Sequence, residues 1–305
     1  MKQRGLLLVL FTAIISGFSI FVNKFGISGI NPYIFTWSKN IVAVIFLFST
    51  IILLNKFKEL ARIKAANWFK LIAIGLIGGS IPFLLFFKGL QMTAATNAAF
   101  IHKTMFVFVM VLSILFLKEK INKKVIFASV AVLIGNFLIL KLSSFSFNLG
   151  DMLIFAATLL WSFEIALSKH TLKELSGEIV AFGRMFFGSL FILLFLVFTG
   201  NIKHVVALTI PQFTWILLTS VFLFLYLFTF YNGLKLVKAH IATSVLLIGS
   251  VVTTALSMFY YGTSISLSQG FGFLMLITGI MVIVGSDFKH LSKQILQRGS
   301  LNGWH

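Results

Sequence analysis

Long apolar runs recur along the whole chain, separated by short polar breaks. Runs such as residues 41–54 and 125–140 are apolar on every side, whereas a strand of a membrane barrel alternates polar and apolar side chains. A helix needs about 20 apolar residues to cross a hydrocarbon layer of about 30 Å. The pattern therefore predicts an all-α integral membrane protein with ten transmembrane helices, over residues 5–25, 32–54, 68–90, 94–117, 125–140, 150–167, 179–198, 213–233, 240–261 and 269–285.

The composition agrees with a membrane protein and excludes a soluble one. Of the 305 residues, 59% are hydrophobic and only 10% are charged, which is too little charge to cover a soluble surface. The chain contains no cysteine, so disulfides, thiolate metal ligands and a thiol nucleophile are excluded. The apolar run after Lys2 and Arg4 is too long for a signal peptide and lacks a small-residue cleavage site, so it is interpreted as the first helix.

The net charge of +18 would suggest a nucleic-acid partner in a soluble protein, but the basic residues fall in the loops. With the amino terminus inside, 18 of the 25 Lys and Arg lie on the inner side, and the outer side holds only Lys24, Lys88, Lys141 and Lys203. Inner loops of membrane proteins carry such an excess. We therefore expect a multi-pass protein of the cell (inner) membrane with both termini cytoplasmic, attracted to anionic lipids and binding no nucleic acid.

The two parts of the chain resemble each other at an offset of 144 to 145 residues. This offset predicts two five-helix repeats, residues 1–142 and 150–286, joined by a linker at 143–149 and followed by a tail at 287–305 that contains an interfacial helix. Because five is odd, the second repeat enters the membrane from the opposite side, an inverted topology that suits alternating access. The matched pairs are Gly89-Leu90 with Gly233-Leu234, Ala95 with Ala239, Ala98 with Ala242, Gly135 with Gly279, Lys39 with Arg184, Phe18 with Phe163 and Lys24 with Lys169.

Several short motifs resemble those of the drug/metabolite transporter superfamily, specifically its EamA type. They are Phe87-Lys88-Gly89-Leu90, Phe116-Leu117-Lys118-Glu119, Gly150-Asp151 and Trp161-Ser162-Phe163. The resemblance covers nearly the whole chain and implies transport of amino acids or other small metabolites by two five-helix repeats. This sequence departs from the family pattern at Lys39, where arginine is usual, and at Gly262-Thr263, which stand where the first repeat has Lys118-Glu119.

One acidic residue, Glu164, lies well inside a predicted span, where burying a charge costs about 2.5 to 3.5 kcal/mol on insertion scales. Lys39, Lys103 and Arg184 lie inside spans too, with His102 beside Lys103. On the functional interpretation, Glu164 carries a proton or binds an amine, and Lys103 or His102 meets a substrate anion. On the alternative interpretation, these residues form a structural ion pair, cap helix ends or extend toward the membrane surface.

The third predicted span is interrupted by Gly75, Gly78, Gly79 and Pro82, and interrupted helices often mark a transport site. Aromatic residues with a polar atom are further candidates. The expected substrate or cavity residues are Glu164, Lys103, His102, Trp161, Tyr231, Tyr226 and Asn97, and the expected structural or gating residues are Lys39, Arg184, Gly79 and Pro82.

We therefore expect a secondary transporter that exports a small polar or zwitterionic, amino-acid-like metabolite by alternating access. A flippase for a lipid-linked substrate, or a channel on the same scaffold, is the alternative. An enzyme is not expected, because the Asp-rich, His-Glu-x-x-His and Gly-x-Ser-Gly motifs of membrane enzymes do not occur. No nucleotide-binding loop occurs either. The expected partners are the small-molecule substrate and the lipid bilayer, without metal or cofactor, and a homo-oligomer stays open.

Overall fold

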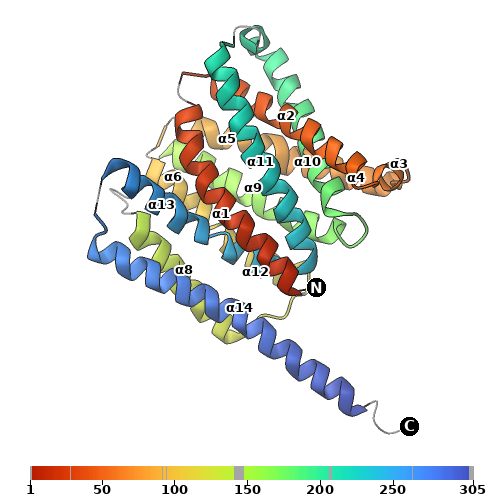
Figure 1. The fold of residues 1–305 in the computed structure, drawn as a ribbon, viewed down its shortest axis with the longest axis vertical. Helices are drawn as coiled ribbons and strands as arrows, with labels where there is room; N and C mark the ends of the chain where they lie inside the picture. Colours follow the sequence, from red (N-terminus) through yellow and green to blue (C-terminus); the bar gives the residue numbers. More distant parts are fainter. Residues whose placement is uncertain are drawn as a thin grey trace.

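A computed structural model describes residues 2–27, 29–90, 92–93, 95–140, 148–205, 208–262 and 264–301, without the side chains of residues 2, 24, 95, 96, 204 and 287–301. Within these ranges every regular element is a helix (Figure 1). The elements are α1 (Lys2–Gly26), α2 (Pro32–Leu53), α3 (Phe57–Ala61), α4 (Ala65–Ile74), the π-helical segment η1 (Gly75–Ser80), α5 (Ile81–Leu90), α6 (Ala95–Lys103), α7 (Met105–Leu115), α8 (Lys123–Leu140), α9 (Leu149–Thr171), α10 (Gly177–Phe198), the 3-10 turn η2 (Asn201–Val205), α11 (Ile210–Leu236), α12 (Ala239–Val245), α13 (Ile248–Tyr261) and α14 (Leu267–Leu301).

Ten helical segments within the described ranges are long and apolar enough to cross a membrane, which confirms the predicted number. Their outward faces carry large apolar side chains such as Phe127, Phe198 and Phe259, which are 77%, 86% and 92% exposed. In a bilayer these faces contact lipid, so their exposure has no cost there.

The third span, Ala65–Leu90, consists of α4, η1 and α5 in sequence. The interruption predicted from the glycines and Pro82 is confirmed, and it takes the form of a π-helical segment over Gly75–Ser80. Such wide turns are rare and often occur at functional sites.

The fourth and ninth predicted spans are both long and apolar enough to cross a membrane, but neither is one continuous helix. The fourth span is divided at Thr104 and the ninth at Leu246 and Leu247. Hydroxyl side chains next to both breaks bond back to backbone carbonyls, Thr104 Oγ1 to Ile101 and Ser244 Oγ to His240. Bonds of this kind bend helices. At the offset of 144 residues, Thr104 corresponds to Ile248, the residue directly after the break in the ninth span.

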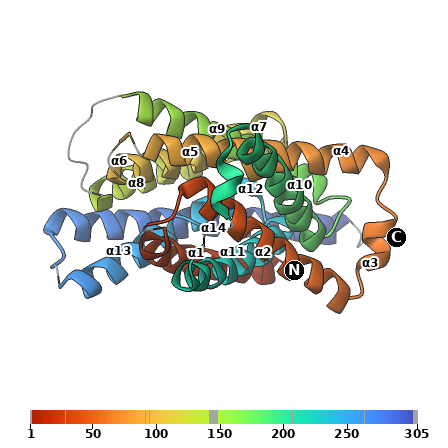
Figure 2. The same cartoon turned by 90° about the horizontal axis from the view of Figure 1, so that it is seen from above.

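Helices from distant parts of the chain pair closely. The helices α1 to α8 are here called the first half of the molecule, and the helices α9 to α14 are called the second half. The helix α8 lies along α14, and α1 lies along α11 (Figures 1 and 2). Gly135 and Gly272 bring the backbones of α8 and α14 together, since a Cβ on either glycine would lie 2.7 Å from the carbonyl oxygen of the other.

The bundle has two ends that differ in charge. The basic end is defined by the start of α1 and by residues 54–64, 116–122, 172–176 and 237–238. Lys169 holds part of this end together by donating to the carbonyl oxygens of Leu234 and Val237, each at 2.6 Å. The opposite end is defined by residues 27, 29–31, 92–93, 199–205, 262 and 264–266.

Some sequence predictions fall on parts that are not described. Residues 143–147 of the predicted linker, Lys141 and the side chains of Lys24 and Ala95 lie outside the described residues. The backbone of the tail is helical to Leu301 and continues the last span as one element (Figure 1). The interfacial face expected for this tail depends on side chains that are not described, so it stays a prediction.

Candidate functional site

The π-helical segment presents the carbonyl oxygen of Gly78 to side chains from other helices. In a regular α-helix this oxygen would accept from the amide four residues later, but that residue is Pro82, which has no N–H. The oxygen instead accepts from Trp161 Nε1 and from Arg184 Nη2, each at 3.0 Å. Both donors belong to the second half, so the interruption in the first half becomes a meeting point of the two.

Glu164 lies one turn after Trp161 on α9 and is buried, with 1% of its surface exposed. Its Oε1 accepts a hydrogen bond from Ser168 Oγ at 2.5 Å and another from Tyr231 of α11 at 2.6 Å. A Cβ on Gly78 would collide with the Glu164 side chain. The glycine therefore leaves the space that this carboxyl group occupies.

Of the three cations predicted inside spans, Arg184 is the one that faces Glu164. Its Nη2 lies 3.9 Å from Glu164 Oε2, and its Nη1 donates to Tyr231 at 3.2 Å. Both charged groups are buried. Within the described part of the molecule, Nε of Arg184 is buried and has no hydrogen-bond partner. Because the two charged groups are 3.9 Å apart and Arg184 Nε has a hydrogen to donate, a further polar group can bind to this pair.

Aromatic rings surround this polar group. The rings of Trp161 and His102 are 4.9 Å apart at their centroids, and Phe86 lies against both. On the other side, Tyr226 stacks on Phe230 at 5.7 Å, next to Tyr231. Four of the seven predicted cavity residues, namely Trp161, Glu164, Tyr226 and Tyr231, thus cluster on α9 and α11, with His102 touching the cluster from α6.

Two predicted cavity residues are not brought to Glu164. Lys103 is half-buried at the end of α6, and Asn97 is half-buried earlier on the same helix. The polar partners of Glu164 are Ser168, Tyr231 and Arg184, and neither Lys103 nor Asn97 is among them. A substrate contact at Lys103 or Asn97 stays a prediction.

The structural or gating residues of the prediction also have defined places. Gly79 packs against α10, where a Cβ would collide with the carbonyl oxygen of Arg184, and Asn40 of α2 donates to the Gly79 carbonyl at 3.4 Å. Lys39 donates to Asn23 Oδ1 at 2.6 Å, and Asn23 in turn donates to Ser19 Oγ at 3.0 Å.

Ser168, Asn23 and Ser19 were not predicted as members of these groups. Their signal is present in the sequence, because Ser19 and Asn23 have the same four-residue spacing as Glu164 and Ser168, at an offset of 145. Residues four apart lie on one helix face. The described residues contain no group of three His, Asp or Glu side chains that could hold a metal ion.

A second set of charged contacts lies at the basic end, and every one of them joins the first half to the second. This set was not predicted from the sequence, and its members are here called the inter-half contacts. They are Lys56 with Glu178 at 2.5 Å, Lys70 with Glu174 at 2.8 Å, Glu59 with the Ser176 amide at 2.8 Å, and Glu119 with His240 at 2.7 Å and the Ala239 amide at 2.9 Å.

Two carboxyl groups of these contacts, those of Glu119 and Glu174, are held in the charged form. Burial alone would raise the pKa of Glu119, but the hydrogen bonds from His240 and the Ala239 amide outweigh burial and hold the pKa below its ordinary value. The hydrogen bond from Lys70, with that from Asn67, lowers the pKa of Glu174. At neutral pH both residues are therefore available as anions.

The opposite end is joined differently. Thr93 donates to Asp151 at 2.5 Å and Gln212 donates to the Gly29 carbonyl at 2.9 Å, and both bonds connect the halves. Among the residues that the structure describes, no ion pair joins the halves there. Charged connections between the halves are thus concentrated at the basic end.

Comparison with known proteins identifies the family. The sequence pattern of the EamA-like transporter family matches residues 3–141 and again residues 148–285. The chain belongs to this family, part of the drug/metabolite transporter superfamily. The resemblance inferred from the short motifs is confirmed, and this EamA-family chain is a multi-pass, ten-helix membrane protein.

Relatives with similar sequences carry names that agree. A protein of Clostridium kluyveri named an uncharacterized transporter is 26% identical over 270 residues, 82% of this EamA-family chain and 84% of its own length. A protein of the same name in Methanothermobacter thermautotrophicus is 22% identical over 92% of this chain and 85% of its own length. The uncharacterized transporter YyaM of Bacillus subtilis is 25% identical, with 82% and 83% coverage.

A solved crystal structure shares the fold. It superposes with a TM-score of 0.74 over 92% of this chain and 98% of its own length, at 14% sequence identity. Similarity at that level shows the fold alone. Together with the family match, it makes this EamA-family protein a transporter by relationship, without naming what is carried.

Proposed function

We propose that this protein is a secondary transporter that exports a small polar or zwitterionic, amino-acid-like metabolite by alternating access, without changing it chemically. The observation that carries the proposal is the buried pair of Glu164 and Arg184 beside the carbonyl of Gly78, which accepts from Arg184 and Trp161. Intramembrane charges are costly and usually serve a substrate or ion.

The geometry favours a substrate with both charges. Glu164 and Arg184 are 3.9 Å apart, so a small zwitterion can place its ammonium group on Glu164 and the Gly78 oxygen while its carboxylate meets Arg184. The Arg184 Nε offers a further buried donor. The rings of Trp161 and Tyr226 would enclose the uncharged part. Lipid-linked substrates would instead need a site open sideways to the bilayer.

The first experiment identifies the substrate class. Purified protein is screened by thermal shift against amino acids, nucleosides and polyamines, because a ligand that binds only the native state raises its melting temperature. We expect amino acids to raise it for the wild type and not for the Arg184→Gln variant. A shift from polyamines that persists in Arg184→Gln would contradict a zwitterionic substrate.

The second experiment tests Glu164 as the proton carrier. In proteoliposomes, Glu164→Gln should keep the fold and still bind the ligand found in the screen, but its transport should lose the pH dependence of the wild type. Asp151→Asn, a change of the same kind at the opposite end, should keep that pH dependence. Unchanged pH dependence in Glu164→Gln would contradict proton coupling through this residue.

Alternating access is supported by the position of the inter-half contacts. The site is buried, so a substrate reaches it only if the halves separate at one end at a time. The four inter-half contacts close the basic end. The exposed pair of Lys70 and Glu174 is weak enough to open and re-form in a cycle, whereas the side chains of Glu178, Glu119 and His240 are largely buried and must be rehydrated when this end opens. We infer that they form the gate at the basic end, between two repeats of inverted topology, residues 1–142 and 150–286.

The same proposal assigns the basic end to the cytoplasm. The excess of Lys and Arg at this end supports it, with both termini inside and the protein in the cell (inner) membrane. A reporter that is active only in the cytoplasm, fused after Arg298, should be active. A reporter fused in the turn at Gly200 should be inactive, and the reverse pattern would contradict the orientation.

A further inference from the structure

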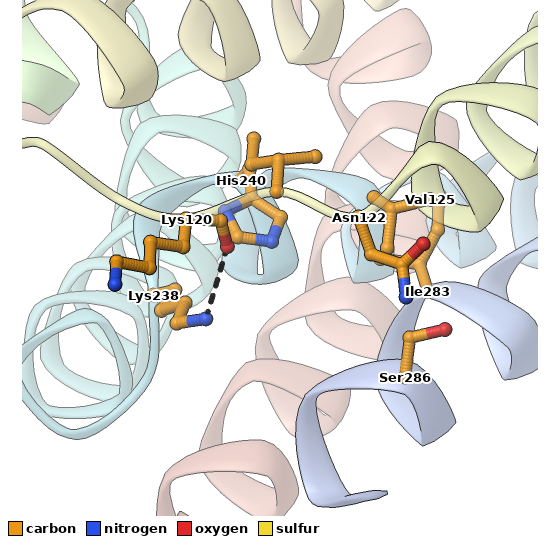
Figure 3. Close-up of a pocket in the computed structure, with 8 residues that line it drawn as sticks. Lys120, Asn122, Val125, Lys238, His240, Ile283 and Ser286 are labelled. Atoms are coloured by element: carbon orange, nitrogen blue, oxygen red, sulfur yellow. Dashed lines mark hydrogen bonds between the residues drawn. The ribbon is translucent and has the colours of Figure 1, made fainter. Parts of the chain in front are cut away.

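A pocket of about 280 Å³ lies at the basic end, between α8, α12 and α14 (Figure 3). It is separate from the Glu164 site. Its polar wall is formed by Lys120, Asn122, Lys238, His240 and Ser286. Its apolar wall includes Val125 and Ile283, which lie on the side of Asn122 and Ser286. None of the eight described residues that line the pocket is acidic.

The charges around the pocket favour an anion. Lys238 and Lys120 lie together on one wall, where Lys238 Nζ donates to the Lys120 carbonyl oxygen at 3.4 Å (Figure 3). That bond holds the Lys238 ammonium group close to the pocket wall. The nearby acid, Glu119, is occupied by His240 Nδ1 and the Ala239 amide. Glu119 therefore fixes the His240 ring without itself lining the pocket.

The shape and place of the pocket favour a phosphate ester. A free ion would leave most of 280 Å³ unfilled, whereas the apolar wall suits the glycerol and acyl part of a lipid. Basic pockets between transmembrane helices on the cytoplasmic side are suited to anionic headgroups. We propose that this pocket binds the phosphate group of an anionic lipid headgroup, held by Lys120 and Lys238.

The site also adjoins the gate. His240 belongs both to the pocket and to the inter-half contact with Glu119. A headgroup in the pocket would lie against His240 and hold its ring in place beside Glu119. An anionic lipid would therefore stabilise the closed basic end. This consequence rests on the proposed gate, whereas the binding itself does not.

Binding is measured on the purified full-length protein in detergent. Phosphatidylglycerol in mixed micelles should raise the melting temperature, and phosphatidylcholine should not. Each of Lys120→Gln and Lys238→Gln should raise the half-saturating phosphatidylglycerol concentration about fivefold, and the double variant about thirtyfold, from the usual attraction of a lysine near an anionic membrane. The matched control is Lys173→Gln, an exposed lysine at the same end outside the pocket, which should change it less than twofold.

Further measurements distinguish a lipid phosphate from free inorganic phosphate. If inorganic phosphate at millimolar concentration raises the melting temperature, and this effect is lost in the double lysine variant, the anion site is supported with free phosphate as its ligand. If the lysine variants fold poorly, Ser286→Asp places a negative charge on the pocket wall and should weaken phosphatidylglycerol binding. An equal loss in Lys173→Gln, an equal shift with phosphatidylcholine, or full affinity in both the double variant and Ser286→Asp would overturn the proposal. Because the readout is binding, a failure of transport would leave this result unaffected.

Discussion

Pro82 shapes the candidate site because proline has no backbone N–H. An alanine or leucine at this position would donate its amide to the Gly78 oxygen and close a regular helical turn. Proline cannot, and the oxygen is free to hold Trp161 and Arg184. A residue that touches neither charge of the site thus decides whether Arg184 is held next to Glu164.

The first prediction separates this role from simple stability. Pro82→Ala should raise the melting temperature, because alanine suits a helix better than proline by up to about 3 kcal/mol. It should also lower transport by about tenfold or more, because the new amide competes for the Gly78 oxygen and a hydrogen bond to a charged group contributes about 1.5–3 kcal/mol. Both are measured on the same preparation.

Pro211→Ala is the matched control, since Pro211 lies in the first turn of α11, where a helix leaves its amides unpaired anyway. It should leave transport unchanged. Full transport activity in Pro82→Ala would show that the Gly78 oxygen plays no part.

The second prediction concerns Glu119 and pH. Its pKa in the folded protein lies below the ordinary value of 4.5. The stabilisation it contributes is therefore complete above about pH 4.5 and is lost as the pH falls through the folded value. Glu119→Gln should melt about 2–6 °C below the wild type at pH 7, and this difference should shrink on acidification below pH 4.5. A difference that stays constant down to pH 3 would contradict the charged contact with His240.

At the residue scale, the sequence could single out Glu164 but not its partner. A single carboxyl group inside an apolar span needs a cation or hydrogen-bond donors beside it, and this need can be recognised from the sequence. Lys39, Lys103 and Arg184 were all available cations. The choice of Arg184 depends on how α9, α10 and α11 pack, and hydropathy carries no information on that packing. The inter-half contacts were missed for the same reason, since each joins residues more than 100 positions apart.

At the scale of elements, the close approach of α8 and α14 rests on glycine. The backbones meet at Gly135 and Gly272, and a side chain on either would push the helices apart. Gly270 lies two positions earlier on α14, and a Cβ there would meet nothing within 4 Å. The same substitution at these two glycines of one helix therefore separates the effect of helix packing from the effect of intrinsic helix propensity.

The third prediction uses this comparison. Gly272→Val should lower the melting temperature by several degrees more than Gly270→Val, because overpacking costs about 1–3 kcal/mol while both changes add the same β-branched side chain to the same helix. The measurement is thermal unfolding in detergent, with retention of the folded monomer followed by size-exclusion chromatography. Equal shifts for the two variants would mean that the contact between α8 and α14 contributes nothing.

The ten spans could be predicted because hydrophobic length alone decides them. The breaks at Thr104 and at Leu246 could not, since a serine or threonine bonded back to a carbonyl has the same hydropathy whether or not the helix bends. The glycines and Pro82 of the third span were informative because both residue types act on the backbone directly.

At the scale of the whole molecule, each half carries a cation next to a hydrogen-bonded pair of polar residues four positions apart. Arg184 lies next to Glu164, which accepts from Ser168, and Lys39 donates to Asn23, which in turn donates to Ser19. The positions correspond at the offset of 145 residues, but only the second half holds a carboxyl group. The shared geometry supports two related repeats, and the unequal chemistry supports a single substrate site in the second half.

The last prediction tests whether the two ends open in turn. Because the protein has no cysteine, pairs can be introduced cleanly. In Lys70→Cys with Glu174→Cys, a short cleavable thiol crosslinker across the gate at the basic end should abolish transport while substrate still binds from the opposite side. In Thr93→Cys with Asp151→Cys, the same crosslinker should also abolish transport, because the opposite end must open in its turn.

Cleaving the crosslinker should restore transport in both, and single-cysteine variants treated in the same way should stay active. A channel needs no such alternation. If transport continued with the basic end crosslinked, the halves would not separate there, and the inter-half contacts would be a fixed structural seam of the bundle rather than a gate.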